Sequence, residues 1–421
     1  MMDLLLHNRA YLMLWLSTLT TRFGNALTLT VLMFMIGSSA KSPLMISLVL
    51  LAQMTPMILI GLFAGTIADR LPKFAVMMGS EYFQLLTVIA MTLFLDQPQV
   101  LLLLIFLQGT GAAFFSPAKT AFISEIVAKD KIPDAIGLSQ GVGQATDLIG
   151  PPLAGALLLL IPGGDILIID AVTFFISAFL IFVSSRFAQI NGISNGGRQK
   201  ERLLQSITCG LKEVATLPEL QFLIIIVFVL MLAAGVFNAT SIAIELQVFG
   251  VNGFEYGLLE ALTGFGAITG SLVGPLLIKR IRPGQFIVSS GVVLGLWMAL
   301  IYVVSLIYPV TGLYALSVWV IGLGLLNSCL NIPVSSLFLL VTPPAFRGRA
   351  AGILQMFSFL GCVIGILAGG ALSVPLGVIP VTIFAGLLMG VVSFGMCLTA
   401  GYKRLITIQT EKKSVTSSRG I

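Results

Sequence analysis

Charged residues inside long apolar runs are the chemically informative feature of this sequence. Arg22 and Asp147 each lie about twelve residues into such a run. At about 1.5 Å of rise per helical residue, both would lie roughly 18 Å deep in a bilayer, near its middle. A charge there costs roughly 2.5–3.5 kcal/mol on insertion scales, so it needs a partner. We therefore predict an ion pair between Arg22 and Asp147, with Asn25 one turn beyond Arg22 able to join it.

Other acids lie closer to the ends of apolar runs. Glu245 is near the end of one run, and Glu260 and Asp170 each lie about one turn into another. A buried carboxyl can bind and release a proton. The pattern indicates proton coupling through Arg22, Asp147, Asp170, Glu245 and Glu260. The alternative is that these charged residues only stabilise the fold. Lys119, near the end of its run, is expected to extend its ammonium group toward the interface.

The composition shows what must position these charges. Of the 421 residues, 57% are hydrophobic and 10% charged, against about 25% charged in soluble domains. That excludes a disordered chain, a nucleic-acid binder and a secreted disulfide scaffold. The four cysteines have no CxxC spacing, and nothing resembles a Walker loop, a His/Cys metal cluster or a Ser–His–Asp arrangement. We therefore expect no enzyme activity, no metal site and no cofactor.

Breaks at glycine, proline and charge clusters divide the chain into twelve runs long enough to cross a bilayer as helices. Twenty of the 23 Lys and Arg residues lie in segments that are cytoplasmic if both termini are inside, which fixes that orientation. The predicted fold is an all-α integral membrane protein with 12 transmembrane helices in two pseudo-symmetric six-helix bundles (6+6), both termini cytoplasmic. The expected spans are residues 10–36, 43–68, 75–95, 100–124, 135–161, 165–186, 219–248, 255–279, 284–308, 311–341, 350–373 and 377–400.

The predicted domains follow from these spans. Residues 1–186 form an N-terminal six-helix bundle, and 219–402 form a C-terminal one. Residues 187–218 are a cytoplasmic linker with a short amphipathic helix, and 403–421 are a disordered cytoplasmic tail. An internal repeat supports the duplication, because four residues match four others at one offset of 215: Gly137, Gln140, Gly150 and Gly155 against Gly352, Gln355, Gly365 and Gly370.

Two motifs resemble a known family over nearly the whole chain. Gly65 to Lys73 is similar to the Gly-x-x-x-Asp-Arg-x-Gly-Arg-Lys signature of the major facilitator superfamily, with Pro72 replacing the later glycine. Gly150 to Gly155 resembles the Gly-Pro-x-x-Gly-Gly motif of its antiporter branch, with Ala154 replacing a glycine. With Gln108 to Lys119 and Asp170 to Phe174, these segments look most like bacterial efflux proteins of the macrolide and siderophore exporter type. In that branch an arginine is expected where Ile105 stands.

The resemblance implies a site and a function. It implies a gating loop of Asp69, Arg70 and Lys73, in which Arg70 would pair with Glu125 or Asp130. It implies a helix-packing motif of Gly150, Pro151 and Gly155. The polar residues on the spans that would line a central substrate cavity are Asn25, Gln108, Ser116, Asn238, Asn327 and Asn331.

The function implied is proton-coupled efflux of a small hydrophobic compound, such as a drug, an antibiotic or a siderophore-like molecule, by alternating access. The expected partners are that compound, protons and the lipid bilayer, with no nucleic acid. The chain is expected to be a monomer in a bacterial inner membrane. A lysophospholipid flippase on the same scaffold, a nutrient importer, and a non-transporting membrane sensor or assembly partner remain alternatives.

Overall fold

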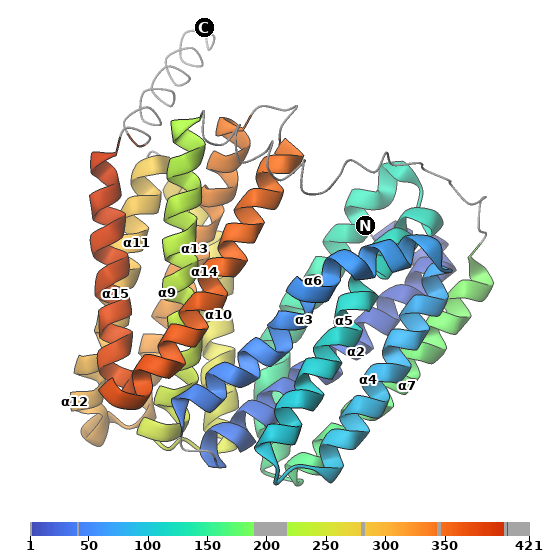
Figure 1. Ribbon diagram of the computed structural model, residues 1–421, viewed down its shortest axis with the longest axis horizontal. Helices are drawn as coiled ribbons and strands as arrows, with labels where there is room; N and C mark the ends of the chain where they lie inside the picture. Colours follow the sequence, from blue (N-terminus) through green and yellow to red (C-terminus); the bar gives the residue numbers. More distant parts are fainter. Residues whose placement is uncertain are drawn as a thin grey trace, which may run out of the picture. The chain divides into compact units, whose positions relative to one another are not determined.

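The computed structural model describes residues 2–39, 42–188, 217–278, 283–342, 347–399 and 402, and this part of the chain forms helices and no strand. The chain divides into two compact units (Figure 1). The first contains Met1–Gly196 and Glu245–Ala261, and the second contains Gly197–Ile244 and Leu262–Ile421. The predicted linker helix and tail lie outside the described residues.

The first unit is built from seven helices within residues 2–187. They are α1 (Met2–His7), α2 (Arg9–Ser39), α3 (Pro43–Arg70), α4 (Lys73–Leu93), α5 (Pro98–Ile126), α6 (Ile132–Leu158) and α7 (Gly163–Phe187). A short 3₁₀ turn, Lys129–Lys131, leads into α6.

The second unit begins with α9 (Pro218–Ala243), which continues into a π-helical turn, η2 (Ile244–Val248). Next comes α10 (Gly253–Ile278), whose first turns belong to the first unit. The remaining elements are α11 (Pro283–Ala299), α12 (Ile301–Thr311), α13 (Leu313–Val341), α14 (Arg347–Leu376), α15 (Val378–Gly395) and the 3₁₀ turn η3 (Met396–Leu398).

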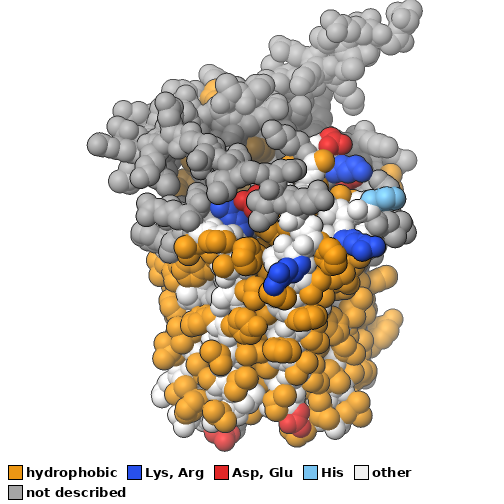
Figure 2. All heavy atoms as spheres, turned by 90° about the vertical axis from the view of Figure 1, so that its right-hand side faces the viewer, with side chains coloured by type: hydrophobic (Ala, Val, Ile, Leu, Met, Phe, Trp, Pro, Cys, Tyr) orange, Lys and Arg blue, Asp and Glu red, His pale blue; other side chains and the backbone are white. Residues whose placement is uncertain are grey.

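Most of these helices are long and apolar enough to cross a membrane. Ten pass by length and composition, or up to eleven if the bent pair α11 and α12 is one span. The helix α6 is not among them, although it has 27 residues, because its interior carries polar side chains such as Gln140 and Asp147. Figure 2 shows a broad apolar band on the face that includes α4 and α7, with Lys and Arg side chains along one edge.

One predicted span is broken into two helices. Residues 284–308 were expected to form a single helix, but α11 and α12 meet at a 43° bend. Near this break the Trp319 indole N–H donates to the Trp297 carbonyl, and the Trp297 indole donates to the Trp319 carbonyl, both at 2.9 Å. A side-chain donor that competes for a helix carbonyl is a recognised cause of a kink.

The helices of the two units pair according to one plan. In the first unit α2 packs on α6 and α7, α5 packs on α3 and α4, and α4 packs on α7. In the second unit α9 packs on α14 and α15, α13 packs on α11, and α11 packs on α15. The helix α10 also meets α13, since a β-carbon at Gly266 would collide with the Ile321 carbonyl. Each of these pairings in the first unit has a counterpart in the second, as the predicted repeat requires.

The glycines of the repeat lie at equivalent contacts. A β-carbon added at Gly150 of α6 would collide with the Ala26 side chain of α2. One added at Gly365 of α14 would collide with the Leu232 carbonyl oxygen of α9. Small residues allow membrane helices to approach this closely, so the offset of 215 residues reflects a shared way of joining the first and fifth helices of each repeat.

Candidate functional site

A fully buried carboxyl lies in the first unit, on α4. Glu81 has no exposed surface. The Thr21 hydroxyl of α2 lies 3.1 Å from each of its carboxyl oxygens. Ser177 of α7 also interacts with Glu81, and its hydroxyl is 2.7 Å from the Ser17 hydroxyl of α2. The carboxyl is therefore hydrogen-bonded to α2 and lies near a hydroxyl pair that joins α2 to α7.

A second fully buried carboxyl, Asp170, lies on α7. The Thr28 hydroxyl of α2 donates to its Oδ2 at 2.6 Å, and the Thr173 hydroxyl donates to its Oδ1 at 2.9 Å. Gly24 makes room for it, because a β-carbon there would collide with both Asp170 and Thr173. Asp170 and Glu81 are within electrostatic range of each other. We call Glu81, Asp170 and their hydroxyl partners the carboxyl network.

Charged side chains connect this network to the surface of the unit. Glu81 interacts electrostatically with Lys119 of α5, and Lys119 with Arg22 of α2. Arg22 interacts with Asp147 of α6. Arg22 and Asp147 are exposed, whereas Lys119 is half-buried with its Nζ 5.9 Å from the Phe115 ring centroid. Lys119 therefore interacts with the network on one side and with Arg22 on the other.

The predicted ion pair between Arg22 and Asp147 is not formed, since no nitrogen–oxygen contact within 4.0 Å joins these two described side chains. The guanidinium group instead lies against Gly143, one turn before Asp147, where a β-carbon would come within 2.8 Å of Nη1. Asn25, expected to join the pair, accepts a hydrogen bond from Gln108 Nε2 of α5 at 3.0 Å.

This amide pair borders a small cavity beside the carboxyl network. Asn25, Thr28, Gln53 and Gln108 contribute the polar lining, and the cavity measures about 10 Å³. A polar space of this size holds about one water molecule. Because Thr28 also donates to Asp170, the cavity lies next to the buried carboxyl.

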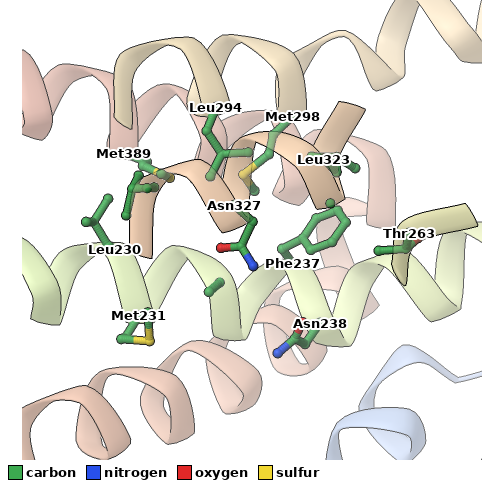
Figure 3. A pocket seen from close by; sticks show the side chains of 13 residues that line it. Leu230, Met231, Phe237, Asn238, Thr263, Leu294, Met298, Leu323, Asn327 and Met389 are labelled. Carbon is green, nitrogen blue, oxygen red and sulfur yellow. The ribbon is translucent and has the colours of Figure 1, made fainter. Parts of the chain in front are cut away.

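The second unit has a larger and mainly apolar cavity of about 120 Å³ (Figure 3). Met231, Met298 and Met389 line it together with Phe237 and several leucines. Polar groups come from Asn238, Asn327 and Thr263. In Figure 3 the Asn327 side chain lies among the apolar side chains, and Asn238 extends from α9 on another side. Two of the predicted cavity residues, Asn238 and Asn327, thus line one pocket.

The other predicted residues lie elsewhere. Ser116 is half-buried on α5. Asp69 and Arg70 end α3 and Asn331 lies on α13, but their side chains are outside the described part of the structure. Lys73 begins α4 with its Nζ 3.9 Å from Glu125 Oε1, so the acid predicted to meet Arg70 has Lys73 as a neighbour.

The residues of the predicted packing motif lie between two helices. Gly150 faces α2, as described above. A β-carbon at Gly155 would come within 2.6 Å of the Gly253 carbonyl oxygen, and one at Gly257 within 2.5 Å of the Pro151 carbonyl oxygen. The motif therefore brings the backbone of α6 against the first turns of α10.

Glu245, Tyr256 and Glu260 gather where α9 turns into α10. Glu245 lies in η2 and is 3% exposed, and its Oε2 has no hydrogen-bond partner. Tyr256 is 2% exposed and interacts electrostatically with both acids. Neighbouring Glu255 differs, because it exchanges two 2.9 Å hydrogen bonds with Asn252 in a capping box. No group of three or more His, Cys, Asp or Glu side chains arranged to hold a metal ion is found in the described ranges.

The sequence reasoning missed Glu81, although it lies inside the predicted span 75–95. Applying the rule that selected Asp147 to every span would have found it. A second signal is the polar stripe on α2, where Ser17, Thr21, Gly24 and Thr28 recur at helical spacing. These residues all face α4 or α7.

Comparisons with known proteins agree with this architecture. The family model described as Major Facilitator Superfamily matches residues 14–365. An uncharacterised MFS-type transporter of Bacillus subtilis strain 168, YfiS, is 25% identical over 366 residues, which are 86% of this chain and 85% of YfiS.

Solved structures share the fold at lower identity. A bacterial homologue of the iron transporter ferroportin, in an inward-facing state, matches with a TM-score of 0.73 and 16% identity, covering 93% of this chain and 99% of that one. A variant of the nucleoside transporter NupG matches with a TM-score of 0.72 and 16% identity, covering 92% and 98%. Because the family model matches most of its length, this chain belongs to the Major Facilitator Superfamily and is a multi-pass membrane transporter.

Proposed function

We propose that this transporter exports a small, largely hydrophobic compound in exchange for protons. The observation that carries the proposal is the carboxyl network, in which Glu81 and Asp170 are fully buried among membrane helices and held by hydroxyl groups. Burying an ionised carboxylate without a close cation is costly. Such a carboxyl is well suited to accept a proton as one step of a transport cycle.

The exposed charges give this network a route to water. Asp147 and Arg22 lie on the surface of the first unit and interact with each other. Lys119 interacts with both Arg22 and Glu81. In the proposed cycle Asp147 exchanges protons with water. The interactions of Arg22 and Lys119 then change as Asp147 and Glu81 gain or lose a proton. Asp170, Glu245 and Glu260 are the further carboxyls assigned to proton coupling.

The cavity of the second unit supports a hydrophobic substrate. Methionine side chains are flexible and polarizable, so they adapt to compounds of different shape. Asn238 and Asn327 supply the few polar groups that fix orientation in a mainly apolar pocket. In the first unit Asn25, Gln108 and Ser116 are proposed to meet the substrate during its passage, and Asn331 is proposed to do so in the second unit.

The proposal includes the membrane arrangement. Twelve spans form two six-helix bundles with both termini in the cytoplasm, and the protein acts as a monomer in a bacterial inner membrane. Asp69, Arg70 and Lys73 form the gating loop, and Gly150, Pro151 and Gly155 maintain the close packing of α6.

The test uses inverted membrane vesicles that contain the transporter and are acidified inside. Hydrophobic antibiotics, siderophores and lysophospholipids are added in turn, and a pH-sensitive dye reports proton release. One compound class should trigger release from wild-type vesicles, and Asp147→Asn should abolish it while the protein still folds. Asp96→Asn, which changes an exposed acid between α4 and α5, is the matched control and should behave as wild type.

Other outcomes would reject the proposal. Lysophospholipid movement without proton release would identify a flippase and leave Asp147 as a structural residue. Movement of a compound into cells down its own gradient, with no proton flux, would identify an importer. Full proton release by Asp147→Asn would remove this residue from the coupling path.

A further inference from the structure

We propose that Glu245, Tyr256 and Glu260 form a binding site for one divalent, oxygen-preferring cation such as Ca²⁺ or Mn²⁺. The inference goes beyond the proposed export, and it replaces the proton-coupling role proposed above for Glu245 and Glu260, because a bound cation would hold both acids ionised. It concerns the π-helical turn η2 and the start of α10, which lie together in the first unit.

The backbone brings the three side chains together. The π-helical turn ends α9 and displaces Glu245 from the regular helical register. The Val251 N–H then donates to the Glu245 carbonyl at 3.1 Å, which folds the start of α10 back onto the turn. Tyr256 and Glu260 are four residues apart on α10, so their side chains share one face of that helix. Single π-helical turns often occur at functional sites.

The side chains form a buried acidic cluster that lacks its own counter-charge. Glu245 is 3% exposed and its Oε2 has no hydrogen-bond partner. In the described part of the chain, the titratable groups that interact with Glu245 are Glu260 and Tyr256, and neither is a cation. A buried carboxylate oxygen without a donor or a cation is rare in folded proteins because it costs the full desolvation energy.

The two acids do not share a proton directly. A shared proton requires the carboxyls to hydrogen-bond, and no such bond within 3.5 Å joins Glu245 and Glu260, which are both described. The two carboxylates also balance the charge of one divalent ion, and carboxylate oxygens suit Ca²⁺, Mg²⁺ and Mn²⁺.

Glu255, in the first turn of α10, provides a matched control. It is an acid only ten residues from Glu245 in the chain, but both its backbone N–H and its carboxylate are engaged with Asn252. Its carboxylate therefore already has a donor and does not need a metal ion.

The experiment titrates Mn²⁺ into the purified full-length protein in lipid nanodiscs and follows free Mn²⁺ by electron paramagnetic resonance. Wild type and Glu255→Gln should each bind one Mn²⁺ per chain, and Ca²⁺ should displace it. Glu245→Gln and Glu260→Gln should each weaken binding at least tenfold, and Tyr256→Phe should weaken it less. If Glu245→Gln does not fold, Glu260→Gln alone tests the site.

Three results would overturn the inference. These are no Mn²⁺ binding by wild type, unchanged binding in Glu260→Gln, and displacement of Mn²⁺ by Na⁺ as effective as displacement by Ca²⁺. The measurement needs neither a proton gradient nor a substrate. Failure of proton exchange through Asp147 would therefore leave this result standing, whereas Mn²⁺ binding would remove Glu245 and Glu260 from the proposed proton path.

Discussion

The two units use one packing plan around different interiors. Each joins its helices in the same pairs, and equivalent glycines close the contact of α2 with α6 and of α9 with α14. In the first unit the interior contains the carboxyl network of Glu81 and Asp170. In the second unit the corresponding helices surround a methionine-lined cavity with Asn238 and Asn327 as polar groups.

The difference separates what the two units share from what differs between them. Close helix contacts leave no room for an added β-carbon, so glycine occupies the equivalent positions 150 and 365. Interior side chains can differ, provided that buried polar groups find partners. Hydroxyl groups on α2 supply those partners in the first unit. We propose that proton coupling belongs mainly to the first unit and substrate binding mainly to the second. Four substitutions probe the two units.

The largest effect is expected from Gly365→Ala in α14. The added β-carbon would collide with the backbone oxygen of Leu232, which no side-chain rotation can relieve. Overpacking of this kind costs roughly 1–3 kcal/mol and occasionally more. The melting temperature and the yield of monodisperse protein should both fall. Gly352→Ala on the same helix is the control, since nothing lies within 4 Å of its β-carbon; equal losses in the two variants would mean that the glycine contact does not join the helices.

Glu81→Gln should uncouple transport without unfolding the first unit. The amide can still accept a hydrogen bond from Thr21, but it cannot bind and release a proton. A coupling free energy of roughly 1–3 kcal/mol corresponds to a 5–150-fold effect, so proton-driven export in proteoliposomes should fall by that factor. Substrate binding should change little. Undiminished proton-driven export would place the coupling outside the carboxyl network.

Asn327→Ala should weaken substrate binding in the second unit. Loss of one hydrogen bond costs roughly 0.5–1.5 kcal/mol, so the dissociation constant of an exported compound should rise by up to about tenfold. Tryptophan fluorescence, with Trp297 and Trp319 near the cavity, can follow binding. Gln108→Ala in the first unit is the comparison. A larger loss there than in Asn327→Ala would reverse the proposed roles of the two units.

Lys73→Ala should have the smallest effect on stability. Its Nζ lies 3.9 Å from Glu125 Oε1, and the Glu125 side chain is 39% exposed. Solvated ion pairs contribute about 0–1 kcal/mol, so the melting temperature should be nearly unchanged. Any large loss of export at constant stability would show that Lys73 acts in gating, as proposed for its loop, and not only in this ion pair.

Several features of the fold could be predicted from the sequence because the bilayer imposes them. Long apolar runs must become helices when no water is present to satisfy the backbone, and the predicted spans coincide with helices, apart from the break between α11 and α12. The repeat at an offset of 215 residues was visible because close helix contacts require glycine at fixed positions.

The site depended on tertiary structure. The sequence located Arg22 and Asp147 at similar depth, but only the packing of α2 on α6 showed that Gly143 receives the guanidinium group and that no ion pair forms. It gave no reason to connect Glu81 with Thr21, since this contact joins different helices. Depth follows from counting residues along one helix. The face that a side chain presents, and the partner it meets, depend on how neighbouring helices pack, because in these spans almost every face is apolar.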